Sequence, residues 1–179
     1  MSQNHALIAE MKMEAANTRK ILERVPVEKN DWKPHRKSMS LGRLATHVAE
    51  IPGWVTATMT TDELDFAKTE YKPHIAQSTQ ELLDILDKNV NEGVNALENS
   101  KDEDFDKMWT LRNGDQVYFT LPKKAVLRSF VLSHHYHHRA QLGVYLRLLD
   151  IPIPGMYGPT ADEMEATNAE TAPAEAIAN

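Results

Sequence analysis

The chain has 179 residues, of which 41% are hydrophobic and 26% charged, a composition that predicts one soluble globular domain with a real core. Its net charge of −6 argues against nucleic acid as the main partner, and the absence of cysteine excludes disulfides, thiolate metal sites and cysteine nucleophiles. The N-terminus carries no secretion signal, and no apolar run reaches the ~20 residues needed to cross a bilayer. We therefore expect a cytoplasmic protein with no membrane association.

Apolar residues at three- and four-residue spacing predict four helices. Ser40 and Ser78 are favourable N-caps for the second and third of them. Pro52 interrupts the second helix and should kink or break it near Ile51. The predicted helices cover approximately residues 4–24, 40–58, 78–98 and 122–149.

The dipeptide Asn113-Gly114 lies between β-prone segments and predicts a small hairpin ahead of the last helix. The fold class expected for residues 1–160 is therefore all-α, an up-down four-helix bundle with one β-hairpin. Residues 161–179 contain five acids, no Lys or Arg and little apolar surface. That composition predicts an acidic, disordered tail.

Four of the eight histidines fall within the run His134–His138. Because successive helical residues advance by about 100°, His134 and His138 share one face, with His135 and His137 on either side. The apolar residues of the fourth helix centre on the same direction, so we expect the pair to point straight at the core. The residues that set this direction are Leu127, Phe130, Val131, Tyr145, Leu148 and Leu149.

Two inward imidazoles need partners for their ring nitrogens, and either a metal ion or hydrogen bonds within the core could supply them. The spacing lets one ion reach both rings. The sequence contains no His-Glu-x-x-His motif, so a zincin-type peptidase is not indicated. His47 shares a face with apolar residues of the second helix, although a lone inward histidine is more often a hydrogen-bonded core residue. Three inward histidines on two helices favour a metal site, and three ligands leave coordination positions open, as in catalytic sites.

Several neighbouring residues allow two interpretations. Glu50 either orients a ligand or acts as a base, or is an ordinary exposed helix residue. Gln141 either hydrogen-bonds a ligand or substrate, or packs in the core. Arg139 is expected to point away from the site and to pair with an acid or a neighbouring subunit. Three tryptophans could line a pocket, but we interpret them as core residues that support the fold: Trp32, Trp54 and Trp109.

The opposite side of the fourth helix also carries apolar or small side chains. A helix that is apolar on two sides is usually covered on both, so we expect a homodimer through this second face. The hairpin or loops are the alternative cover. The residues of this face are Ala125, Leu132, Tyr136 and Gly143.

Three stretches of the chain resemble the DinB family: Leu-Gly-Arg-Leu-Ala-Thr-His47-Val-Ala-Glu, Ser133-His-His-Tyr-His-His-Arg-Ala-Gln-Leu142 and Ile-Pro-Gly-Met-Tyr-Gly-Pro159. The resemblance covers roughly residues 5–163 and implies a four-helix bundle that holds one divalent ion with three histidines. Carried over to this sequence, these are His47, His134 and His138. Dimers are frequent among members of this family. Its members include thiol-dependent S-transferases and isomerases as well as metal-dependent hydrolases, so the resemblance implies one of these activities.

The sequence therefore favours a metal-dependent enzyme that acts on an unidentified small molecule by hydrolysis or thiol transfer. Imidazole ligands suit zinc, nickel, iron and copper, so the identity of the ion stays open. The alternative is a non-catalytic metal- or ligand-binding protein serving in stress response or interaction. Haem binding is a further alternative, but histidines this close together on one helix would crowd a porphyrin. A structural metal site would need a fourth protein ligand. The candidates for a fourth ligand are His35, His74, Glu50 and His137.

Overall fold

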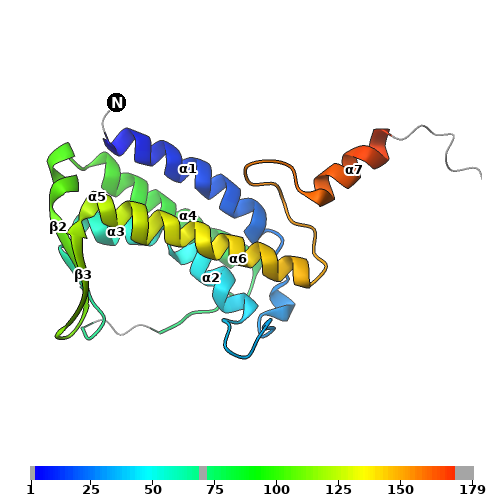
Figure 1. Cartoon of the computed structure of the whole chain (residues 1–179), viewed down its shortest axis with the longest axis horizontal. Helices are drawn as coiled ribbons and strands as arrows, with labels where there is room; N and C mark the ends of the chain where they lie inside the picture. Colours follow the sequence, from blue (N-terminus) through cyan, green and yellow to red (C-terminus); the bar gives the residue numbers. More distant parts are fainter. Residues whose placement is uncertain (1–2, 69–71, 172–179) are drawn as a thin grey trace, which may run out of the picture.

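The computed structural model describes residues 3–68 and 72–171, which form a mostly helical protein with a small three-stranded sheet (Figure 1). Among these residues, we find no helix with the length and hydrophobicity of a membrane span. The helices are α1 (Gln3–Leu22), α2 (Leu41–Glu50), α3 (Gly53–Thr60), α4 (Thr79–Glu98), α5 (Lys123–Val126), α6 (His134–Leu148) and α7 (Ala161–Thr171). The strands are β1 (Glu63–Asp65), β2 (Met108–Asn113) and β3 (Gln116–Pro122), and short 3-10 turns cover Val27–Lys29 and Asp102–Asp106.

The helix starts and the break in the second predicted helix follow local sequence signals. The Ser40 hydroxyl accepts the Arg43 amide hydrogen bond at the start of α2, and Ser78 does the same for Glu81 at the start of α4. The chain turns at Ile51 and Pro52, so α2 and α3 are separate helices. This break confirms the effect predicted for Pro52.

Helices α1, α2, α4 and α6 pack side by side, and the sheet lies at one end of them (Figure 1). Two apolar clusters follow one another along the helices, and a smaller one lies under the sheet. Fully buried side chains at their centres are Leu22, Leu44, Leu86 and Leu142 in the first, Ile51, Phe105 and Leu127 in the second, and Trp109 and Val126 in the third.

The hairpin forms where it was predicted, with β2 and β3 antiparallel. Asn113 pairs with Gln116, so Gly114 and Asp115 make the turn, and Gly114 adopts a positive φ of 59°. Strand β1 adds a parallel partner to β2 and was not predicted. Three residues are too few to show an alternating pattern, and their pairing partner lies more than forty positions away in the chain.

The predicted fourth helix is a continuous helical path, but its middle differs from an ideal α-helix. Residues Leu127–Ser133 form a π-helical segment between α5 and α6, and each π turn holds more residues than an α turn. A helical wheel that assumes a constant angle of about 100° per residue across this segment therefore assigns the wrong residues to the buried face.

Within α6 the predicted core direction is wrong. The buried side chains are His135, Arg139, Leu142 and Leu146, whereas Leu148 is 58% exposed. His134 and His138 are half-buried at one edge of this buried stripe rather than at its centre. The reason is that two polar residues, His135 and Arg139, are buried because their partners lie on α1. A pattern of hydrophobic residues does not predict this burial.

The first part of the predicted tail is helical. Helix α7 projects at the end of the molecule opposite the sheet (Figure 1). Arg147 forms a two-pronged ion pair with Asp162, and Glu163 accepts hydrogen bonds from the Gly155 and Thr160 amides. The structure describes Ala161–Thr171 as a helix, and residues 172–179 lie outside the described residues. The acidic, disordered tail stays a prediction. The domain boundary at residue 160 stays a prediction.

The second face of the last helix, from which a homodimer was predicted, contacts α1 of the same chain. The Tyr136 hydroxyl donates to Glu10, Leu132 is buried, and a Cβ on Gly143 would lie 3.7 Å from Ile21. Part of this face is therefore covered within the chain, whereas Tyr136 and Gly143 also line an open apolar cavity of about 610 Å³. The homodimer stays a prediction.

Candidate metal centre

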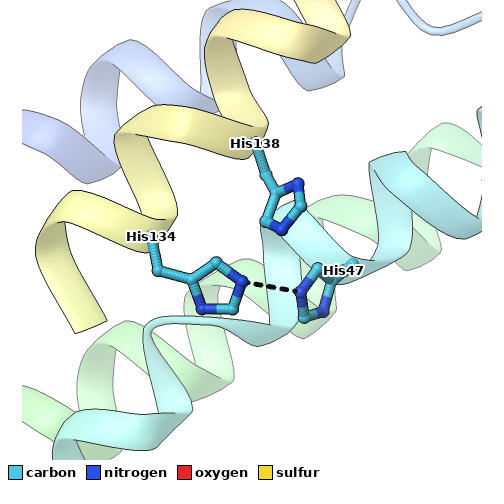
Figure 2. Close-up of side chains that lie close together, drawn as sticks. All are labelled: His47, His134 and His138. Carbon is cyan, nitrogen blue, oxygen red and sulfur yellow. Dashed lines mark hydrogen bonds between the residues drawn. The ribbon is translucent and has the colours of Figure 1, made fainter. Parts of the chain in front are cut away.

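Three histidine side chains converge between α2 and α6 (Figure 2). Nε2 of His47 lies 3.4 Å from Nε2 of His134, and one ring nitrogen from each of the three residues lies within 4.8 Å of the others. His138 completes the group, with ring centroids 4.9 Å from His47 and 4.6 Å from His134. The structure thus brings together the three residues singled out from the sequence.

Helix geometry explains why these residues meet. His134 and His138 are one turn apart on α6, and α6 packs against α2, which carries His47. The three side chains are half-buried, and His47 retains 15% of its side-chain surface. They are therefore partly screened from water but still reachable from outside.

The distances fit a single ion. Two nitrogens bound to one tetrahedral zinc at bond lengths of about 2.0–2.1 Å lie about 3.4 Å apart. The separation between His47 and His134 is the same, and side-chain rotation can close the remaining gap to His138. The three histidines are therefore close enough to hold one metal ion.

The protonation of the rings also suits a metal. Burial, reinforced by His138 and His47, lowers the pKa of His134 to about 4. Burial likewise lowers the pKa of His138, with contributions from His47, His137 and Arg43. Both rings are neutral at pH 7, which is the form that binds metal ions.

Gln141 fixes the orientation of His138. The Nδ1–H of His138 donates to Oε1 of Gln141 at 2.7 Å, which leaves Nε2 of the neutral ring with a free lone pair. Of the two interpretations of Gln141, hydrogen bonding to a candidate ligand side chain is therefore the one observed.

Arg43 and Glu50 flank His47 on its Nδ1 side. Arg43 Nη2 donates to Glu50 Oε2 at 2.8 Å, and this oxygen lies 3.7 Å from His47 Nδ1. Although burial opposes it, the interactions with His47 and Arg43 lower the pKa of Glu50. Glu50 is thus a carboxylate that faces the outer nitrogen of His47, and it is neither exposed nor unpaired.

Sequence reasoning missed Arg43. It precedes His47 by four residues and Glu50 by seven, so the three share one face of α2. This spacing was readable from the sequence. Nothing in it, however, showed that the face lies beside α6.

The remaining predicted histidines fall outside the group. His74 pairs with Glu81 at 2.6 Å, and His35 Nδ1 accepts the Lys37 amide hydrogen bond. His137 is exposed, with its ring beside that of His138. Among the described residues, no fourth His, Cys, Asp or Glu joins the three-histidine group.

His135 has a different environment from its neighbours. It is 4% exposed, and its Nε2 lies 3.1 Å from the Thr18 hydroxyl on α1. Burial and the nearby Arg139 lower its pKa to about 3. Arg139 points away from the three-histidine group and pairs with Glu14, as expected for an acid partner. Both residues belong to the core rather than to the site.

The conserved-sequence profile of the DinB family matches residues 1–173, nearly the whole chain. The chain belongs to the DinB family. This assignment confirms the resemblance seen in the sequence around His47 and His134–Leu142.

Relatives of known sequence or structure agree with the assignment. The chain is 29% identical over 154 residues to the uncharacterized protein YrdA of Bacillus subtilis, covering 84% of this chain and 85% of YrdA. A DinB-like protein from Bacillus cereus superposes with a TM-score of 0.65 at 21% identity, covering 86% of this chain and 97% of that one. The DinB-like protein YjoA of Bacillus subtilis gives 0.64 at 18% identity, covering 84% and 96%. These two structures establish the shared DinB-like fold.

Proposed function

We propose that this DinB-family chain is a metal-dependent enzyme that holds one divalent ion, zinc, nickel or iron, with His47, His134 and His138. Its reaction is hydrolysis or thiol transfer on a small molecule. The observation that carries this proposal is the convergence of three imidazoles, with no fourth His, Cys, Asp or Glu joining them among the described residues. A three-ligand site leaves room for water or substrate, whereas structural sites are closed.

A bound divalent ion would supply a Lewis acid that polarises a carbonyl or lowers the pKa of a bound water or thiol. The chain itself supplies orientation. Gln141 holds the proton of His138 on Nδ1, and the Glu50 carboxylate faces Nδ1 of His47. Because Glu50 is already bonded to Arg43, we assign it a positioning role and not that of a general base.

Two finer features belong to the same proposal. We group the helices as a four-helix bundle in which α2 with α3 forms one member and α5 through α6 another, supported by the packing of α1, α2, α4 and α6. We also retain the homodimer as a proposal, tested by sedimentation at micromolar concentration. A monomer would contradict it.

The metal proposal is tested by elemental mass spectrometry of untagged protein, before and after reconstitution with zinc, nickel, iron or manganese. We expect a nearly stoichiometric ion in the wild type and its loss in His138→Ala. His137→Ala is the matched control, because His137 is the adjacent residue and stays outside the group.

Absence of any ion after reconstitution, or equal metal content in the two variants, would contradict the proposal. Thermal unfolding of both variants shows whether each still folds. A stoichiometric ion without turnover of hydrolase or thiol-transfer substrates would favour the alternative of a non-catalytic metal-binding protein.

A further inference from the structure

The three-histidine group has aromatic rings on one side. The Trp54 and Phe130 ring centroids lie 6.0 Å and 5.8 Å from that of His134, and 4.6 Å from each other. Phe119 on β3 extends the series, 5.3 Å from Phe130. We call Trp54, Phe130 and Phe119 the aromatic wall. It links helix α3, the π-helical segment and the sheet to the histidine edge of α6.

The opposite side of the group is polar. Gln141 bonds to His138, and Arg43 bonds to Glu50 beside His47. Arg43 and Glu50 offset each other in charge, so this side offers hydrogen-bonding groups without an excess of one sign. The site is therefore apolar toward the sheet and polar toward the start of α2.

The aromatic wall is not a sealed part of the core. Trp109 and Val126 beneath it are buried, whereas Trp54, Phe130 and Phe119 are only half-buried. Leu121, which pairs with the buried Trp109 and lies two residues beyond Phe119 on the same face of β3, is 37% exposed. Partly exposed rings beside a candidate metal site resemble the apolar lining of small-molecule sites, where a few polar groups fix the ligand's orientation.

We propose that the aromatic wall binds the apolar arm of the substrate, whose polar head lies at His47, His134 and His138. The substrate class is a small amphiphilic molecule with a metal-binding head and an aromatic or alkyl arm. This inference rests on the proposed metal function. It adds a specificity determinant, because a wall of rings favours an apolar arm over a polar one of equal size.

The test compares two metal-binding probes, acetohydroxamate and benzohydroxamate, by isothermal titration calorimetry on the metal-loaded full chain. The probes share a head group and differ in a methyl against a phenyl arm. We expect benzohydroxamate to bind at least about tenfold more tightly, as burial of one ring would produce. In Phe130→Leu and Trp54→Leu this preference should shrink, while acetohydroxamate affinity and metal content stay unchanged.

Tyr118→Leu is the matched control. Tyr118 is an aromatic residue of β3 next to Phe119, but its ring packs on Phe66 and is 49% exposed. This variant should keep the full preference. Equal binding of the two probes to the wild type, or no binding of either to a protein that retains its ion, overturns the aromatic wall and leaves the metal site standing. Loss of the ion itself in the wild type overturns both proposals.

Discussion

The run His134–Arg139 supplies side chains to two neighbouring sides of α6, one buried and one half-buried. On the buried side, His135 bonds to Thr18, and Arg139 pairs with Glu14 at 2.5 Å. On the half-buried side, His134 and His138 have nitrogens that face other imidazole nitrogens. The buried groups have several partners each, whereas Nε2 of His134 has a single hydrogen bond, to Nε2 of His47, which a metal ion bound by both nitrogens would replace.

The buried network is closed by several partners. Arg139 also donates to the Glu14 carbonyl and to the Thr18 and Tyr157 hydroxyls, and Tyr157 donates in turn to the Glu14 carboxylate. Arg139 and Glu14 are each 4% exposed. This network ties α1, α6 and the segment before α7 together through groups that bond to one another.

The largest effect should come from breaking this network. Glu14→Ala leaves the Arg139 guanidinium buried without its counter-ion, and we expect it to lower the free energy of unfolding by about 3–5 kcal/mol. Urea denaturation measures the change.

Glu10→Ala is the control for that measurement. Glu10 lies one turn earlier on α1, pairs with Arg128, whose side chain is 58% exposed, and accepts a hydrogen bond from the half-buried Tyr136 hydroxyl. Its loss should therefore cost about 1–2 kcal/mol, less than the loss of Glu14. Equal costs for the two variants would show that the buried pair has no special role in stability.

A smaller effect, confined to the half-buried region, should follow Gln141→Leu. Removing the acceptor for His138 Nδ1–H frees the ring to rotate and to change tautomer, so we expect metal affinity to fall about tenfold with little change in stability. Competition with a chromogenic chelator measures the affinity.

Gln141→Glu, which keeps an acceptor oxygen at this position, should retain or raise the affinity. If the Leu variant binds metal as tightly as the wild type, Gln141 has no positioning role. Together with Glu14→Ala, the pair of variants separates stability from binding on two sides of one helix.

The smallest effect concerns the anchor of α7, an exposed counterpart of the buried network. Asp162→Ala removes the ion pair with Arg147 and the acceptor for the Ile153 amide. We expect faster hydrogen exchange at Ile153 and no measurable change in global unfolding. Glu165→Ala on the same helix should leave the exchange unchanged, and protection that survives in Asp162→Ala would contradict the anchor.

The pH dependence of this anchor follows from the carboxylate. The hydrogen bonds from Arg147 and Ile153 lower the pKa of Asp162 to about 2. A carboxyl group whose pKa is lowered by folding stabilises the structure above its unfolded value of about 3.9 and loses that contribution as the pH falls. Ile153 should therefore stay protected from pH 7 to about 4 and lose protection as the pH approaches 2.

The three candidate ligands were predictable, although part of the argument for them was wrong. The four-residue spacing of His134 and His138 and the apolar neighbours of His47 identified the right residues. The wheel placed the pair at the centre of the buried stripe, because it counted the exposed Leu148 as core and ran through the π-helical segment at a constant angle. The spacing is a local property and survived this error, whereas the direction of burial did not.

The helix starts at Ser40 and Ser78, the break at Pro52 and the hairpin at Gly114 are encoded locally, because N-capping, the proline ring and a positive φ act within a few residues. The buried side of α6, and the meeting of His47 with His134 and His138 across two helices, depend instead on how the helices pack. A buried Arg139 looks like a surface residue until Glu14 on a distant helix neutralises it. Burial depends on partners brought together by folding, and partners far apart in the chain leave no local pattern.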